Sequence, residues 1–75
     1  MHFRRYMRRG TVEAGAWIPG VNMAGVSISE EDRKAGSPKE GDMIARNPDN
    51  HADKWLIAHA FFRKNYIQLD PAQEK

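Results

Sequence analysis

The chain has 75 residues, no cysteine, and 12 basic against 10 acidic residues, for a net charge of +2. This length is enough for one domain with a marginal core, and the lack of cysteine excludes a disulfide framework, a thiolate zinc site and a cysteine nucleophile. The longest apolar run, Trp55 to Ala58, is far shorter than the about 20 residues of a membrane-spanning helix, so no membrane partner is expected.

Residues 1–10 form a basic segment that predicts either an N-terminal arm or the lead-in to a first strand. Its arginines could contact a phosphate backbone while an interleaved aromatic ring stacks on bases, which is one hypothesis for function. The alternative is a solvated edge strand whose charges protect it against unwanted pairing. The candidate nucleic-acid-binding residues are Arg4, Arg5, Tyr6, Arg8 and Arg9.

Residues 11–18 alternate in a period of two, which predicts a strand with one buried face that ends at Pro19-Gly20. Val12 lies on the expected buried face, and Trp17 points away from it. An exposed tryptophan is a favoured anchor for a protein partner.

Residues 21–28 are predicted to be irregular, with a short extended piece from Gly25 to Ile28. One or two helical turns follow, because Ser29 can accept a hydrogen bond from the amide of Asp32. Acidic residues fill the first turn, basic residues fill the last, and Gly36 suits the left-handed position after the helix.

The next segment predicts a hairpin. Met43 to Arg46 and Lys54 to Ala58 have the composition of short strands, and residues 47–51 between them are rich in turn formers. Antiparallel pairing of the two strands is therefore expected.

A short helix is predicted from His59 to Lys64, because apolar residues recur there at helical spacing. Tyr66 to Leu69 can return as a last strand. Residues 70–75 are predicted to be a disordered tail, so the single globular domain spans residues 11–69.

Together these elements predict an α+β fold with a three- to four-stranded antiparallel sheet, partly curled, and one or two short helices. An SH3-like β-barrel is the alternative architecture. The residues expected in the core are Val12, Ala14, Ile18, Ile44, Trp55, Ile57, Phe62 and Ile67.

Polar side chains stand at every second position of the hairpin loop, namely Asn47, Asp49, His51 and Asp53. The alternation is similar to a calcium-binding loop, but alanine occupies the positions of the required glycine and glutamate. A pair formed by His51 and His59 would be needed for a histidine- or metal-dependent enzyme, which is the weakest hypothesis. No nucleophile elbow, phosphate loop or zinc motif occurs, so no enzymatic activity, metal or cofactor is predicted.

Several segments resemble a group of small proteins encoded by tailed phages and prophages. The matching segments are Phe3-Arg4-Arg5, Val12 to Trp17 (VEAGAW), Gly36 to Pro48 (GSPKEGDMIARNP), Asn50 to Ala58 (NHADKWLIA) and Phe62 to Tyr66 (FRKNY). Residues 6–10 depart from the pattern, because they are longer than the usual short basic-proline link. The resemblance implies a phage origin and a setting in the host cytoplasm, and it implies no catalytic residue.

The leading hypothesis is therefore a non-enzymatic phage accessory protein that binds and modulates a host protein, for host takeover or against host defence. The candidate protein-interaction residues are Trp17, Asp49, Asn50, His51 and Asp53. The alternative is a nucleic-acid-binding accessory protein that uses the basic segment. Self-association into a homodimer is a further expectation to test.

Overall fold

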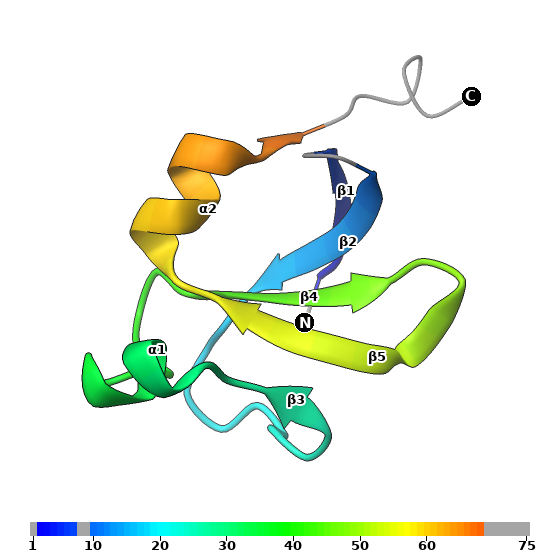
Figure 1. Cartoon of the computed structure of the whole chain (residues 1–75). Helices are drawn as coiled ribbons and strands as arrows, with labels where there is room; N and C mark the ends of the chain where they lie inside the picture. Colours follow the sequence, from blue (N-terminus) through cyan, green and yellow to red (C-terminus); the bar gives the residue numbers. More distant parts are fainter. Residues whose placement is uncertain (1, 8–9, 69–75) are drawn as a thin grey trace.

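A sheet of six strands and two short helices make up residues 2–7 and 10–68, the part of the chain that the computed structural model describes (Figure 1). The elements in chain order are β1 (Arg4–Met7), β2 (Thr11–Ala16), β3 (Val26–Ser27), α1 (Glu30–Lys34), β4 (Met43–Asn47), β5 (Asn50–Ile57), α2 (His59–Asn65) and β6 (Ile67–Gln68). The strand order is β3-β5-β4-β2-β1-β6. The predicted tail at 70–75 lies outside the described residues.

The sheet is mixed and open, which corrects the predicted architecture while confirming the α+β class. β3 pairs with β5 in parallel, whereas the other pairings among the described strands are antiparallel. Six described strands replace the expected three or four. Because β3 and β6 stand at opposite edges, the sheet does not close into the alternative SH3-like barrel. β3 and β6 lie within the segments predicted to be extended, Gly25 to Ile28 and Tyr66 to Leu69. With two residues each they are too short to show a period, so their places in the sheet were not predicted.

The β4–β5 hairpin confirms the predicted antiparallel pair. Its turn is tighter than expected, because β5 begins at Asn50 rather than at Lys54. The Oδ1 atom of Asn47 accepts a hydrogen bond at 2.9 Å from the amide of Asp49, a local bond typical of such turns. The polar residues after Asn50 therefore belong to a strand and not to a loop.

One face of the sheet packs against α2 and forms a core. Its centre consists of Ala14, Ala45, Ile57 and Phe62, with Tyr6, Met43, Trp55 and Tyr66 packed around it. Ala14 and Ala45 are cross-strand partners, so two small side chains face the helix where it lies over β2 and β4. The Phe62 ring occupies that room, because protein interiors are filled without voids.

The predicted core is confirmed in part. Ala14, Ile44, Ile57 and Phe62 are buried, and Val12 and Trp55 are half-buried. Two expectations are wrong, since Ile18 and Ile67 are 53% and 65% exposed. Ile18 lies beyond the end of β2 at Ala16, and Ile67 lies in the edge strand β6.

α1 begins as the sequence predicts. The Ser29 Oγ atom accepts a hydrogen bond at 3.1 Å from the amide of Asp32. Gly36 follows the helix with a φ of 101°, the left-handed conformation that glycine adopts without strain.

The start of α2 is held by Asp42, a carboxylate that is 0% exposed. Ala58 precedes this helix and has no side chain that could cap it. Instead Asp42 Oδ1 accepts a hydrogen bond at 3.2 Å from the backbone amide of His59. Its Oδ2 atom accepts from the Ser37 hydroxyl at 2.6 Å and from the Lys39 amide at 3.0 Å. This buried carboxylate therefore fixes where α2 leaves the sheet.

Candidate functional site

A charged cluster occupies the face of the sheet opposite α2. Glu13 Oε1 accepts a hydrogen bond at 2.7 Å from Arg46 Nε and lies 3.2 Å from His51 Nε2. The ring of Phe3 lies under the guanidinium of Arg46, with 4.0 Å from Cζ to the ring centroid. Arg5 is the cross-strand partner of Glu13. The cluster thus sets one carboxylate against two guanidinium groups, and it keeps a net positive charge.

The pKa of the Glu13 carboxyl lies below its usual value of 4.5. The hydrogen bond from Arg46 is the main cause, and burial opposes it. The charges of Arg46, His51 and Arg5 add to the lowering. Glu13 is thus held as a carboxylate by its neighbours, a structural role rather than that of a proton donor.

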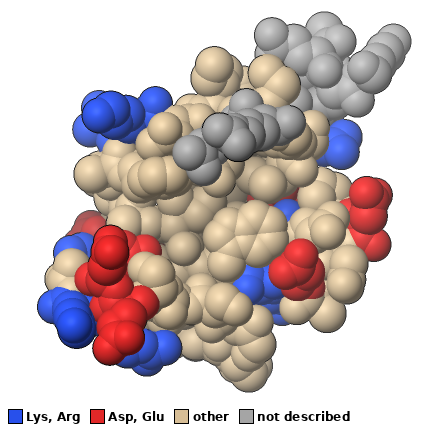
Figure 2. All heavy atoms as spheres, viewed as in Figure 1, with Lys and Arg blue, Asp and Glu red and all other residues tan. Residues whose placement is uncertain are grey.

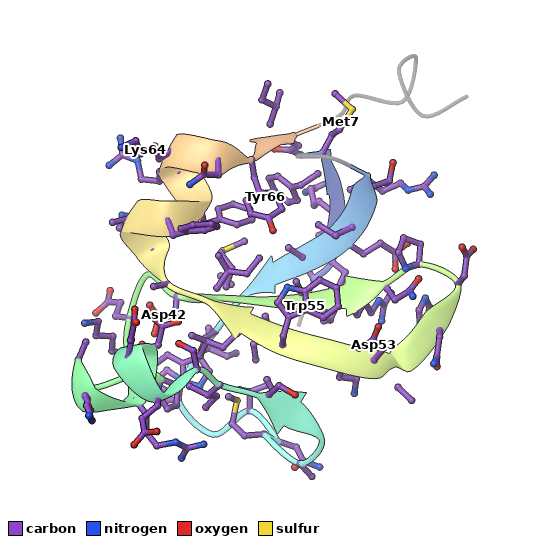
Figure 3. All side chains as sticks on the ribbon, viewed as in Figure 1. Met7, Asp42, Asp53, Trp55, Lys64 and Tyr66 are labelled. Atoms are coloured by element: carbon purple, nitrogen blue, oxygen red, sulfur yellow. The ribbon has the colours of Figure 1, made fainter. Side chains whose placement is uncertain are left out.

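The candidate protein-interaction residues do not form one surface. Trp17 is half-buried after β2, where its amide donates to the Asp42 carbonyl at 2.9 Å. Asp49 lies at the hairpin turn, at the other end of β4. A strand of five residues is about 16 Å long, so these two positions stand well apart. Asn50 and Asp53 are exposed on β5, where Figure 3 shows Asp53 on the half of the strand nearer the turn, and His51 turns toward Glu13.

Within the basic segment, Arg4–Met7 form strand β1 of the sheet rather than a free arm. Arg4 and Arg5 are neighbours on β1, so their side chains lie on opposite faces. The ring of Tyr6 packs edge-on against Phe62 with a centroid distance of 4.6 Å. Tyr6 thus belongs to the core rather than to a base-stacking surface. Arg8 and Arg9 lie outside the described residues.

The two histidines of the weakest hypothesis are far apart. His51 is the second residue of β5 and His59 is the first residue of α2, and the strand from His51 to its end at Ile57 spans roughly 20 Å. The His59 ring places Nδ1 3.0 Å from the Gly41 carbonyl oxygen. No group of three or more metal-ligating side chains occurs within residues 2–7 and 10–68.

A groove that the sequence did not reveal lies between α1, β5 and α2. Its volume is about 380 Å³. Aromatic side chains line it from β5 and α2, and polar side chains line it at α1. The aromatic residues are Trp55, Phe61 and Tyr66, and the polar residues are Ser29, Glu31 and Asp32. We call this site the aromatic groove.

Two of the rings that line the groove, Phe61 and Tyr66, lie near one another, and Tyr66 is backed by Phe62. Tyr66 stacks on Phe62 at a centroid distance of 5.1 Å and an interplanar angle of 12°. Phe61 lies 6.4 Å from Tyr66 and remains 45% exposed. Figure 3 shows the side chain of Tyr66 beneath α2 and that of Trp55 on β5 below it. The Tyr66 ring is therefore held in place by the buried ring of Phe62.

The opposite side of the groove is acidic. Glu31 and Asp32 come from the first turn of α1, and Figure 2 shows acidic side chains gathered over this helix, with basic ones beside them. The ion pairs among the described residues all involve Glu13, so neither Glu31 nor Asp32 is in one.

One local signal could have indicated the groove. Phe61 and Phe62 are consecutive residues of a helix, and consecutive positions are about 100° apart around the axis. Both rings cannot face the same core, so one of them had to lie at its margin. The structure buries Phe62 and leaves Phe61 on the groove.

Comparison of the chain with protein-family models, with curated proteins and with solved structures found no match. Neither of the two described helices has the length and apolar character needed to cross a membrane.

Proposed function

We propose that the chain is a non-enzymatic accessory protein that binds a partner protein through the aromatic groove. The observation that carries this proposal is the set of three aromatic rings that line an open groove between two helices and a strand. Aromatic side chains in a pocket are the usual anchors of protein recognition. The resemblance of Gly36 to Pro48 and of Asn50 to Ala58 to phage proteins supports a host protein in the host cytoplasm as the partner, with modulation of that protein as the outcome.

The hydrogen bonding of the reactive side-chain types supports binding rather than catalysis. Ser37, Asp42 and His59 lie close together, which is the composition of a hydrolytic triad. Their bonds are different, because the Ser37 hydroxyl donates directly to Asp42 and the His59 ring contacts the Gly41 carbonyl. A triad needs the histidine between serine and aspartate. All three residues instead hold the turn before β4 against α2.

Site-specific photo-crosslinking tests the proposal. A photoreactive phenylalanine analogue at Phe61 should crosslink to a host protein in nuclease-treated host lysate. The matched control carries the same analogue at Lys64, which lies on the outer side of α2, away from Trp55 (Figure 3). We expect the host-protein product only, or at least about tenfold more strongly, from position 61.

Three results would overturn the proposal. Equal crosslinking from positions 61 and 64 would show that the groove is not the contact. A product made only of two copies of the chain would indicate a homodimer interface. Recovery of nucleic acid alone before nuclease treatment would favour the alternative that uses Arg4 and Arg5.

A further inference from the structure

A row of charged side chains crosses the sheet on the face opposite α2. Arg5 is paired with Glu13, Glu13 with Arg46, and Arg46 with Lys54, so the row runs through β1, β2, β4 and β5 in succession. Directly paired residues of antiparallel strands point to the same face of a sheet. With strands about 4.8 Å apart, the row is about 14 Å long. We call it the cross-sheet row.

The cross-sheet row carries more positive than negative charge. Glu13 is its one acidic member, and its Oε1 atom already accepts from Arg46 Nε at 2.7 Å and lies 3.2 Å from His51 Nε2. Neither Arg5 nor Lys54 is in an ion pair with a described residue. Three cationic side chains therefore share one carboxylate, and the row keeps a net positive charge.

The cationic ends of the row are open to an anion. The Nε atom of Arg5 is the one buried side-chain nitrogen or oxygen among the described residues that has no hydrogen-bond partner. The terminal nitrogens of Arg5 and Lys54 make no described bond either, so they are exposed to solvent. The side chain of Arg46 is 25% exposed. An anion at the Arg5 guanidinium would offset part of the cost of burying an unpaired charged donor.

The composition of the row favours a phosphate backbone over a protein surface. All four positions are charged, so the row offers none of the apolar side chains that anchor the centre of a protein interface. Interfaces with nucleic acids are polar and positively charged. The ring of Phe3 lies under the Arg46 guanidinium, 4.0 Å from Cζ to the ring centroid. Aromatic rings and guanidinium planes are the groups on which unpaired bases stack.

We infer that the cross-sheet row binds the phosphate backbone of a single-stranded nucleic acid, with Arg5, Arg46 and Lys54 contacting successive phosphates. The three cations stand in one line, as do the phosphates of one strand. Two of them come from β4 and β5, so the site is not the basic N-terminal segment. Arg4 points to the other face of β1 and takes no part. The inference does not depend on the aromatic groove, which lies between α1, β5 and α2.

Fluorescence anisotropy of a labelled oligothymidine tests the inference. A length of about 12 nucleotides lies within the range that one small domain covers. We expect saturable binding at low salt that weakens as salt is added. For three phosphate contacts, the logarithm of the affinity should fall against the logarithm of the salt concentration with a slope of about −2.

Two pairs of variants locate the site. Arg5→Gln and Lys54→Gln should each weaken binding about fivefold or more and make the salt slope shallower by about 0.7. The matched controls remove the same charge elsewhere, Arg4→Gln on the other face of β1 and Lys64→Gln on the outer side of α2 (Figure 3). Each control should change the affinity by less than about twofold. Thermal melting checks that each variant is folded, and either pair alone decides the question. Glu13→Gln removes the acid of the row and should tighten binding.

Absence of binding at low salt would overturn the inference. Equal losses from Arg5→Gln and Arg4→Gln, or from Lys54→Gln and Lys64→Gln, would also overturn it, because the row would then not be the contact. An oligoglutamate that competes as well as an unlabelled oligothymidine of equal charge would assign the row to an acidic peptide instead. Tighter binding of a duplex than of the single strand would exclude a single-strand site.

Discussion

Asp42 caps the first residue of α2 from outside that helix, with Oδ1 3.2 Å from the amide nitrogen of His59. The two residues are 17 positions apart in sequence. A side-chain cap normally comes from the residue directly before the helix, where this chain has Ala58. The bond therefore joins the turn before β4 to α2, and with it the wall that carries Phe61 and Tyr66.

Removing this carboxylate should destabilise the whole fold. Asp42→Ala leaves the Ser37 hydroxyl and two backbone amides without their buried acceptor, so we expect a loss of at least about 2–3 kcal/mol. Urea denaturation measures the loss. Asp53→Ala, at an exposed position, should change the unfolding free energy by less than about 0.5 kcal/mol. Similar effects of the two substitutions would contradict the role assigned to Asp42.

Gly41 should tolerate no side chain. Its φ is 95°, and a Cβ atom there would lie 3.1 Å from Cγ of His59. Gly41→Ala should therefore cost more than the about 1 kcal/mol of an ordinary left-handed alanine. Gly25→Ala separates the two causes, because Gly25 has a φ of 77° but open space around it. In thermal unfolding, the melting temperature of Gly41→Ala should be clearly lower than that of Gly25→Ala. When both substitutions are made in a His59→Ala background, the difference between the two melting temperatures should be smaller.

The two adjacent phenylalanines should separate binding from stability. Phe62→Ala should cost about 3–5 kcal/mol, because that ring fills the core. Phe61→Ala should cost under about 1 kcal/mol, because the ring is half-exposed, yet it should abolish capture of the partner. Thermal melting and quantitative capture from host lysate measure the two effects. Full capture by a folded Phe61→Ala variant would argue against the groove as the docking site.

Glu13 should contribute stability that depends on pH. Its pKa is lower in the folded chain than in the unfolded chain, so the contribution is fully present above the unfolded value of 4.5 and is lost as the pH falls through the folded pKa. Glu13→Gln should therefore destabilise by about 1 kcal/mol near neutral pH and by progressively less in acid. Denaturation at a series of pH values measures this difference.

The same comparison in an Arg46→Gln background provides the control. Without Arg46, the main cause of the lowered pKa is gone. The effect of Glu13→Gln should then be small and nearly independent of pH. An unchanged pH dependence in this background would show that another group holds the Glu13 carboxylate.

Sequence patterns correctly predicted the structural features that are set by residues close together in the chain. The Ser29 cap, the β4–β5 hairpin and the helix at Phe62 each rest on interactions within a few positions, and each is present. Ile18 was wrongly assigned to the core because its burial depends on where β2 ends, and Ile67 because its burial depends on the position of β6 in the sheet. A period-two pattern gives neither the end of a strand nor its place in the sheet.

The groove could not be predicted because its walls come from three separate segments. The segments are Ser29 to Asp32, Trp55 to Ala58, and Phe61 to Tyr66. Their meeting depends on the parallel pairing of β3 with β5, which brings Ser27 beside Trp55 and so places α1 next to α2. A parallel contact between a two-residue strand and a strand far along the chain leaves no periodic signal.

Because β3 is short, much of the outer edge of β5 has no paired strand beside it. β3 pairs with β5 only at Lys54 and Trp55, so among the described residues the outer edge of β5 from Asn50 to Asp53 has no neighbouring strand. An open edge is a template on which other chains can assemble into extended sheets, and charged side chains prevent this. Asp53 places a charge on this open edge, so we expect it to oppose the pairing of β5 with a strand of another molecule.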